Sequence, residues 1–221
     1  YQQVETRQRG DAVPWRDLAQ RQSDDLLRRL ESAQGLLALA RNPLMLQIIC
    51  LVHRAHGTMP QRRTELYEEC IKVLLQKWDE AKGLEVFLTA AEARRVLRPL
   101  ALWLHQEEGR THADVEEVKR IIGPHLAQVK RETKQRAEEQ LDRVLTSVRD
   151  RSGLFVGFDV TRYGFQHLSF QEFLAAEEIV KQRQDQQLVE TFGRSWWREP
   201  TLLALGMDDP QFQNILLADL V

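Results

Sequence analysis

The sequence predicts a mostly α-helical chain with a short β-hairpin toward its C-terminal end. Leu, Ala, Glu, Arg and Gln, which are strong helix formers, carry much of the 221 residues, and aromatic residues make up only 7%. Apolar residues recur at helical spacing over most of the chain. This pattern changes to short β-type runs at residues 154–156 and 163–165, which predict the hairpin.

Composition excludes several classes of protein. Hydrophobic residues are 43% and charged residues 29%, which excludes a disordered or collagen-like chain. The net charge of -2 gives no global argument for nucleic acid. Two cysteines, Cys50 and Cys70, are too few for a disulfide scaffold and predict free thiols in a reducing cytoplasm. The longest apolar run, residues 44–52, is far shorter than the roughly 20 residues that span a bilayer.

The first part of the chain is predicted to hold a polar segment, residues 1–22, and a small helical domain, residues 23–58. Ser23 has the character of an N-cap for the first helix. Asn42 and Pro43 form a second start signal, and the helix that follows is apolar nearly all round. We therefore expect it to be the buried centre of this domain, with both Leu46 and Ile49 inside, and to end at Gly57.

Residues 59–183 are predicted to form the next domain, which begins with helices. Thr89 and Glu92 form a capping box, and Pro99 predicts a kink in the helix that they begin. Gly123 and Pro124 predict the end of a shorter helix, and the charged run over residues 130–139 predicts a solvated helix face or loop. The helices are expected at about residues 66–78, 90–104, 115–122 and 141–148.

The hairpin and a closing helix complete this domain. Ser169 and Glu172 form a second capping box, which predicts a helix start at Ser169. Helices, then a hairpin, then a helix is the order of a winged-helix unit. After a polar linker, residues 184–221 are predicted to begin a further helical domain that contains Trp196 and Trp197.

The sequence holds no motif of an enzyme. It contains no GxxxxGK[ST] loop, HExxH, GxSxG or CxxC. Cys50, His53 and His56 recur at helical spacing, which leaves a metal site open as a minor alternative. Because these positions swing round the helix, we favour Cys50 in the core and both histidines at an exposed helix end. The chain is predicted to be neither an enzyme nor a holder of a metal or cofactor.

One motif, residues 165–176, points to a ligand. His167 lies just after a strand and two residues before the predicted helix start at Ser169. Backbone amides and the positive end of a helix favour an anion there, and an imidazole can donate a hydrogen bond to a phosphate. The alternative is that His167 is only a hinge residue between the wing and the helix.

This motif and others, in order along the chain, resemble the helical and winged-helix domains of NACHT-type signalling ATPases of the STAND class. Residues 39–46 resemble the first helical domain of that family. Residues 60–78 resemble the beginning of its winged-helix domain, and residues 151–155 with 165–176 resemble the wing and closing helix. Trp197, Arg198 and Glu199 resemble the start of the following helical domain.

The resemblance implies a function in signal transduction. The family binds ADP or ATP with Mg²⁺ between a P-loop domain and these domains. The resemblance places Pro43 against the adenine and His167 on the β-phosphate of ADP in the closed, inactive state. Exchange for ATP swings the winged-helix domain away and permits oligomerisation. The P-loop domain is missing from these residues, so the chain, which begins at Tyr1, is expected to be a cytoplasmic fragment whose partner is the P-loop domain of its parent.

Two other functions were weighed. A winged-helix DNA binder should carry a basic wing and helix, but Glu172, Glu177 and Glu178 make the helix after the wing mildly acidic. A purely helical interaction module would explain neither the hairpin around Gly157 nor the motif at His167. Both stay as alternatives behind the nucleotide-sensing hypothesis.

Overall fold

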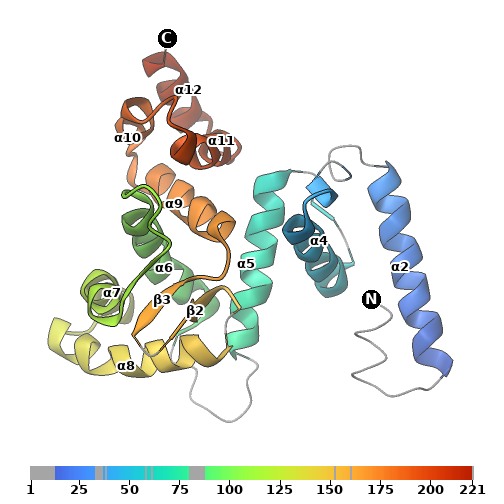
Figure 1. The fold of residues 1–221 in the computed structure, drawn as a ribbon, viewed down its shortest axis with the longest axis horizontal. Helices are drawn as coiled ribbons and strands as arrows, with labels where there is room; N and C mark the ends of the chain where they lie inside the picture. Colours follow the sequence, from blue (N-terminus) through green and yellow to red (C-terminus); the bar gives the residue numbers. More distant parts are fainter. Residues whose placement is uncertain are drawn as a thin grey trace. The chain divides into compact units, whose positions relative to one another are not determined.

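The computed structural model describes residues 13–32, 37, 39–57, 59–60, 62–79, 88–151, 153–159 and 161–220 (Figure 1). The chain divides into two compact units, Tyr1–Val73 and Leu74–Val221. Helix α5 (Arg63–Asp79) crosses the boundary between them. Each unit is described by itself below.

The first unit contains α2 (Val13–Ser32) and α4 (Pro43–His56). Helix α2 begins at Val13, so the predicted start at Ser23 is wrong. Ala19, Leu26 and Leu30 are all buried, and their spacing places them on one helix face. This apolar face begins before Ser23, which therefore lies inside the helix rather than at its end.

Helix α4 has the ends that the sequence predicts. The Asn42 side chain accepts hydrogen bonds from the Leu44 and Met45 amides, at 2.9 and 3.4 Å. Gly57 ends the helix in the left-handed conformation, with φ +66°. The predicted burial of Ile49 is confirmed, whereas that of Leu46 is wrong, because Leu46 is 40% exposed.

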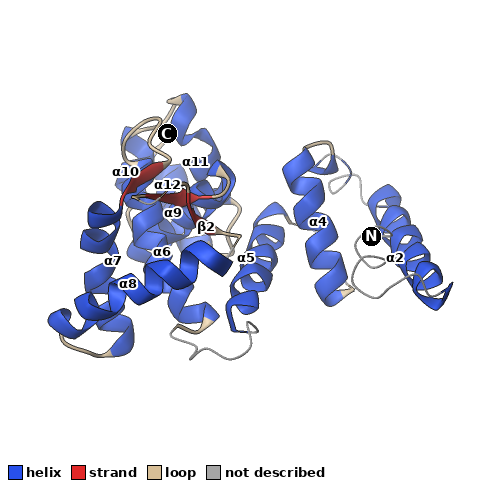
Figure 2. Ribbon diagram, turned by 60° about the horizontal axis from the view of Figure 1, so that its bottom comes forward, coloured by secondary structure: helices blue, strands red, loops and turns tan. Residues whose placement is uncertain are grey.

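The second unit is a winged helix followed by a group of short helices. Its first part runs α6 (Ala90–His105), β1 (His112–Asp114), α7 (Val115–Lys130), α8 (Lys134–Arg151), β2 (Phe155–Gly157), β3 (Arg162–Phe165) and α9 (Leu168–Gln182). The chain then continues through α10 (Asp185–Glu190), the 3₁₀ helix η1 (Ser195–Trp197), α11 (Arg198–Leu205) and α12 (Pro210–Asp219). The strands form a minor element among helices, which confirms the predicted mostly α-helical class (Figure 2).

The three strands form one antiparallel sheet in the order β1-β3-β2. The pairing of β2 with β3 confirms the predicted hairpin, whereas β1 was not predicted. In the middle strand, Gly164 lies opposite His112, and a Cβ atom at this position would collide with the carbonyl oxygen of Thr111. Glycine at position 164 therefore permits the close approach of β1.

The helices of the winged helix are longer than predicted. The capping box of Thr89 and Glu92 is confirmed, and α6 continues past Pro99 to His105. Helix α7 also continues through Gly123 and Pro124, so its predicted end there is wrong. Gly123 is buried, and a Cβ atom there would lie 3.5 Å from Leu141 of α8, which is an ordinary contact distance.

Helix α9 is the central helix of the second unit. It packs along α6 and against α11, and residues 170–180 are all buried (Figure 1). The predicted capping box of Ser169 and Glu172 is wrong, because the N-cap residue is His167 and Glu172 is buried inside the helix. The helix thus begins directly after the motif histidine.

Candidate functional site

The candidate site is the junction between β3 and α9, which the backbone holds on both sides of His167. The amide of Gln166 donates to the carbonyl oxygen of Leu154 at 3.0 Å, which ties the end of β3 to the start of β2. The Phe170 amide donates to the carbonyl oxygen of His167, also at 3.0 Å. His167 is therefore held between a strand pair and the first turn of a helix.

The His167 side chain does not cap the helix that begins after it. His167 has an extended backbone, with φ -136° and ψ 140°, and its half-buried side chain makes no capping hydrogen bond to α9. Its ring centroid lies 6.0 Å from that of Phe170. By contrast, Asn42, Thr89 and Asp209 accept hydrogen bonds at the N-termini of α4, α6 and α12.

This arrangement has the chemistry of an anion site. The first amides of a helix have no partner within the helix, and the helix dipole adds partial positive charge at the same end. An imidazole at the N-cap position adds one N–H donor. The site therefore offers two kinds of donor to one anionic group, and no carboxylate stands at the N-cap to compete.

The second residue that the resemblance names, Pro43, lies in the other unit. It is exposed and occupies the first turn of α4, where its missing amide removes no helical hydrogen bond. Because His167 and Pro43 belong to different units, the structure describes the surroundings of each one separately. Their joint contact with a nucleotide stays a prediction.

A charged cluster that sequence reasoning missed holds α9 against α6. The Glu177 carboxylate accepts a hydrogen bond from Arg94 Nε and another from Arg98 Nη1, each at 2.8 Å. Arg98 Nε also lies 3.3 Å from Glu178 Oε2. These side chains are at most 17% exposed. The signal in the sequence was two arginines one turn apart on α6 and two adjacent glutamates on α9.

The three residues considered as metal ligands in the first unit, Cys50, His53 and His56, do not form a metal site in the structure. His53 is buried, and its Nε2 lies 3.0 Å from Asp25 Oδ2 on α2, so its predicted exposure is wrong. His56 Nε2 lies 3.3 Å from Glu69. Burial raises the pKa of the Cys50 thiol. Within the described part of the chain, no group of three potential ligands could hold a metal ion.

Comparison with known proteins identifies the family. The order α6, β1, α7, α8, β2 and β3 places a helix-turn-helix before a wing. Residues 63–179, more than half of the chain, match the family model described as a winged helix-turn-helix domain C-terminal to NACHT. The chain belongs to this family.

This membership confirms the NACHT resemblance seen in the sequence. The comparisons with curated proteins and with solved structures gave no match. Among the helices that the structure describes, none combines the length and apolarity needed to cross a membrane.

Proposed function

We propose that this NACHT-associated module is the nucleotide-sensing, regulatory part of a signalling ATPase. In the inactive state it closes over ADP that is held by the P-loop domain of the same parent chain. Exchange for ATP with Mg²⁺ lets the winged helix swing away, and the opened protein oligomerises. The observation that carries the proposal is the position of His167 at the N-cap of α9, where its side chain makes no capping bond.

In this function His167 donates a hydrogen bond to the β-phosphate of ADP, and Pro43 packs against the adenine. A hydrogen bond to a charged group contributes about 1.5–3 kcal/mol. Because each 1.4 kcal/mol is tenfold in affinity, loss of this bond should weaken ADP binding by roughly 10- to 150-fold. Only the closed state makes the contact, so the same free energy shifts the balance toward the open state.

The module itself should not hydrolyse ATP. Phosphoryl transfer needs a phosphate cradle, a metal ion and a positioned nucleophile. The cradle and the metal site are proposed to reside in the P-loop domain of the parent. The module then acts as a lid whose contacts depend on the state of the nucleotide, and it needs no cofactor of its own.

Two observations disfavour DNA binding as the alternative. Helix α8, the second helix of the helix-turn-helix, carries five basic and four acidic residues, so it lacks the positive charge that phosphate contacts require. On the wing, Arg162 Nε donates to the Asp159 carboxylate at 2.7 Å, which neutralises this arginine. Neither α8 nor this part of the wing therefore offers the excess of positive charge that phosphate contacts require.

The deciding experiment replaces His167 in the parent protein. His167→Ala should speed ADP dissociation by roughly 10- to 150-fold and raise signalling without input, while the melting temperature stays close to wild type. His112→Ala is the matched control, because His112 is an exposed histidine on β1 of the same domain. If His167 is only a hinge residue, the melting temperature falls and ADP affinity does not change.

A further inference from the structure

A chain of hydrogen bonds links three segments of the second unit through the buried side chain of His105. His105 is the last residue of α6 and is fully buried. Its Nε2 lies 3.0 Å from the carbonyl oxygen of Trp196 in η1. Its Nδ1 lies 3.5 Å from Nε2 of Gln171 in α9. A second hydrogen bond joins the same two residues: the Trp196 indole N–H donates to the His105 carbonyl oxygen at 2.8 Å.

These partners determine which nitrogen of His105 carries the proton. The Trp196 carbonyl can only accept, so His105 Nε2 must be the donor. On the other side, Gln171 Nε2 donates to the carbonyl oxygen of Arg110 at 3.0 Å, which orients the amide with its N–H groups toward His105. His105 Nδ1 therefore accepts, and the ring is the neutral Nε2–H tautomer.

The side-chain amide of Gln171 cannot rotate by 180° without breaking this series of hydrogen bonds. Its Oε1 is buried and has no hydrogen-bond partner among the described residues. Rotation would place that oxygen against the Arg110 carbonyl oxygen and would favour a proton on His105 Nδ1. His105 Nε2 would then lose its proton and face the Trp196 carbonyl as a second acceptor. The Gln171 amide orientation and the His105 tautomer are therefore coupled, and the structure contains the arrangement in which Gln171 donates and His105 carries its proton on Nε2.

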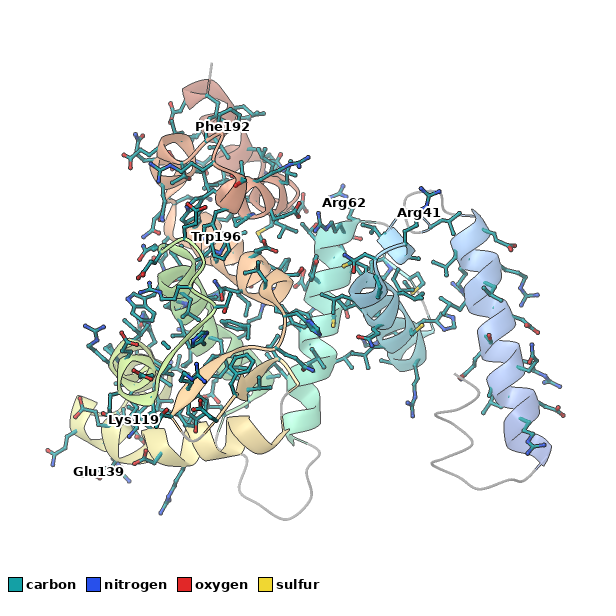
Figure 3. All side chains as sticks on the ribbon, viewed as in Figure 1. Arg41, Arg62, Lys119, Glu139, Phe192 and Trp196 are labelled. Carbon is teal, nitrogen blue, oxygen red and sulfur yellow. The ribbon has the colours of Figure 1, made fainter. Side chains whose placement is uncertain are left out.

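Two aromatic contacts hold the same residues together. The His105 ring is stacked on the Trp196 indole, with centroids 4.5 Å apart and planes 9° apart. The Trp197 ring meets His105 edge-on at 4.8 Å. Figure 3 labels Trp196, which lies close to the first residues of α11. The hydrogen bonds therefore connect α9, through His105 of α6, to η1 and the start of α11.

We propose that Gln171, His105 and Trp196 form a latch that transmits a displacement of the first turns of α9 to η1 and α11. Gln171 follows His167 by four residues, one helical turn. A shift at the N-terminus of α9 therefore moves the amide that donates toward His105 Nδ1. This inference deepens the proposed function, because a nucleotide at His167 would be sensed at α11 through the latch.

The latch can be tested on the chain of residues 1–221 without a nucleotide. Gln171→Met keeps the length of the side chain and removes both donors. The hydrogen exchange of the Trp196 indole N–H with solvent, measured by NMR, should become about tenfold faster in the variant. This factor corresponds to loss of the hydrogen bond from Gln171 to His105, taken as about 1.4 kcal/mol. Nitrogen shifts of the His105 ring should report the Nε2–H tautomer in both proteins, because the Trp196 carbonyl remains, and the Nδ1 shift should move in the variant, because Nδ1 loses its donor.

Gln211→Met is the matched control, because Gln211 is an exposed glutamine on α12 of the same unit. It should change neither readout. An Nδ1–H tautomer in the wild type, or equal Trp196 exchange in wild type and Gln171→Met, would overturn the latch. If Gln171→Met does not fold, Gln171→Leu also removes both donors and leaves the contacts between His105 and Trp196 in place, and its Trp196 exchange decides.

Transmission is tested in the parent protein by hydrogen exchange of backbone amides in residues 195–205. Addition of ADP should slow this exchange in wild type and leave it unchanged in His105→Phe. An equal ADP effect in both proteins would refute transmission through His105. If ADP binds neither protein, the proposed function fails, whereas the latch is still decided by the Gln171→Met measurement.

Discussion

Replacing Glu177 by glutamine should destabilise the second unit strongly. Glu177 is 9% exposed, and both of its oxygens bond to arginines of α6 at 2.8 Å. Glutamine has only one oxygen that can accept, so one arginine loses its acceptor. The amide N–H₂ of glutamine then faces a guanidinium N–H, and two donors cannot form a hydrogen bond. Breaking a buried pair by removing one partner costs about 3–5 kcal/mol. Arg98 keeps its contact with Glu178, so we expect the lower end, about 3 kcal/mol.

The assay is urea unfolding of the 1–221 chain followed by circular dichroism, with the transition of the second unit fitted separately. With a slope of about 2 kcal/mol per M, a loss of about 3 kcal/mol lowers the midpoint by about 1.5 M. Glu116→Gln is the matched control, because Glu116 contacts Lys119 at 3.0 Å but is 78% exposed. Its effect should stay within about 1 kcal/mol.

A double-mutant cycle separates the ion pair from other effects of the substitution. Arg94→Gln combined with Glu177→Gln should cost less than the sum of the two single variants, because the pair is then removed together. The reasoning would be refuted if Glu177→Gln unfolded within about 1 kcal/mol of wild type, or if it matched the exposed control.

Three further predictions test the packing and the charge state of the chain. Ile49→Ala should cost about 2–5 kcal/mol in urea melts because Ile49 is fully buried, and Leu46→Ala, at a 40% exposed site, should cost clearly less; equal costs would contradict the burial pattern. Gly164→Ala should cost about 1–3 kcal/mol and speed amide exchange in β1, because its Cβ meets the Thr111 carbonyl; unchanged exchange in β1 would contradict this. Burial lowers the pKa of His105 to about 4, although its hydrogen bond to Trp196 opposes this. The unfolded value, about 6.5, is higher, so the unfolded chain binds more protons between the two values. The contribution of neutral His105 to the free energy of unfolding is therefore fully present above about pH 6.5 and decreases by up to about 3 kcal/mol toward pH 4. Subtracting the pH profile of His105→Phe from that of wild type should isolate this decrease.

Local signals in the sequence predicted several features correctly. Asn42, Gly57 and the pair Thr89–Glu92 mark helix ends where they were expected. These signals work because a cap joins a side chain to a backbone group only two or three residues away. The hairpin of β2 and β3 was also predicted, since its strands are joined by a short connection.

The same local rules failed where packing overrides them. Gly123 and Pro124 have the character of a helix end, yet α7 continues through them and packs against α8. Ser169 and Glu172 fit a capping box, yet α9 begins before Ser169 and buries Glu172 within the unit. Leu46 fits a helix that is apolar all round, yet its face is exposed.

The sequence by itself determined the helical class, the ends of α4, the start of α6 and the wing, whereas the role of His167 stays a prediction. Only the tertiary structure revealed β1, because three residues are too few for alternation to identify a strand, and they become one by pairing with β3 some 50 residues away. The same holds for the bonds from Arg94 to Glu177 and from Gln171 to His105, which join residues 83 and 66 positions apart. Such contacts depend on how whole helices pack against one another, and helix periodicity shows which face is buried but not which residue it will meet.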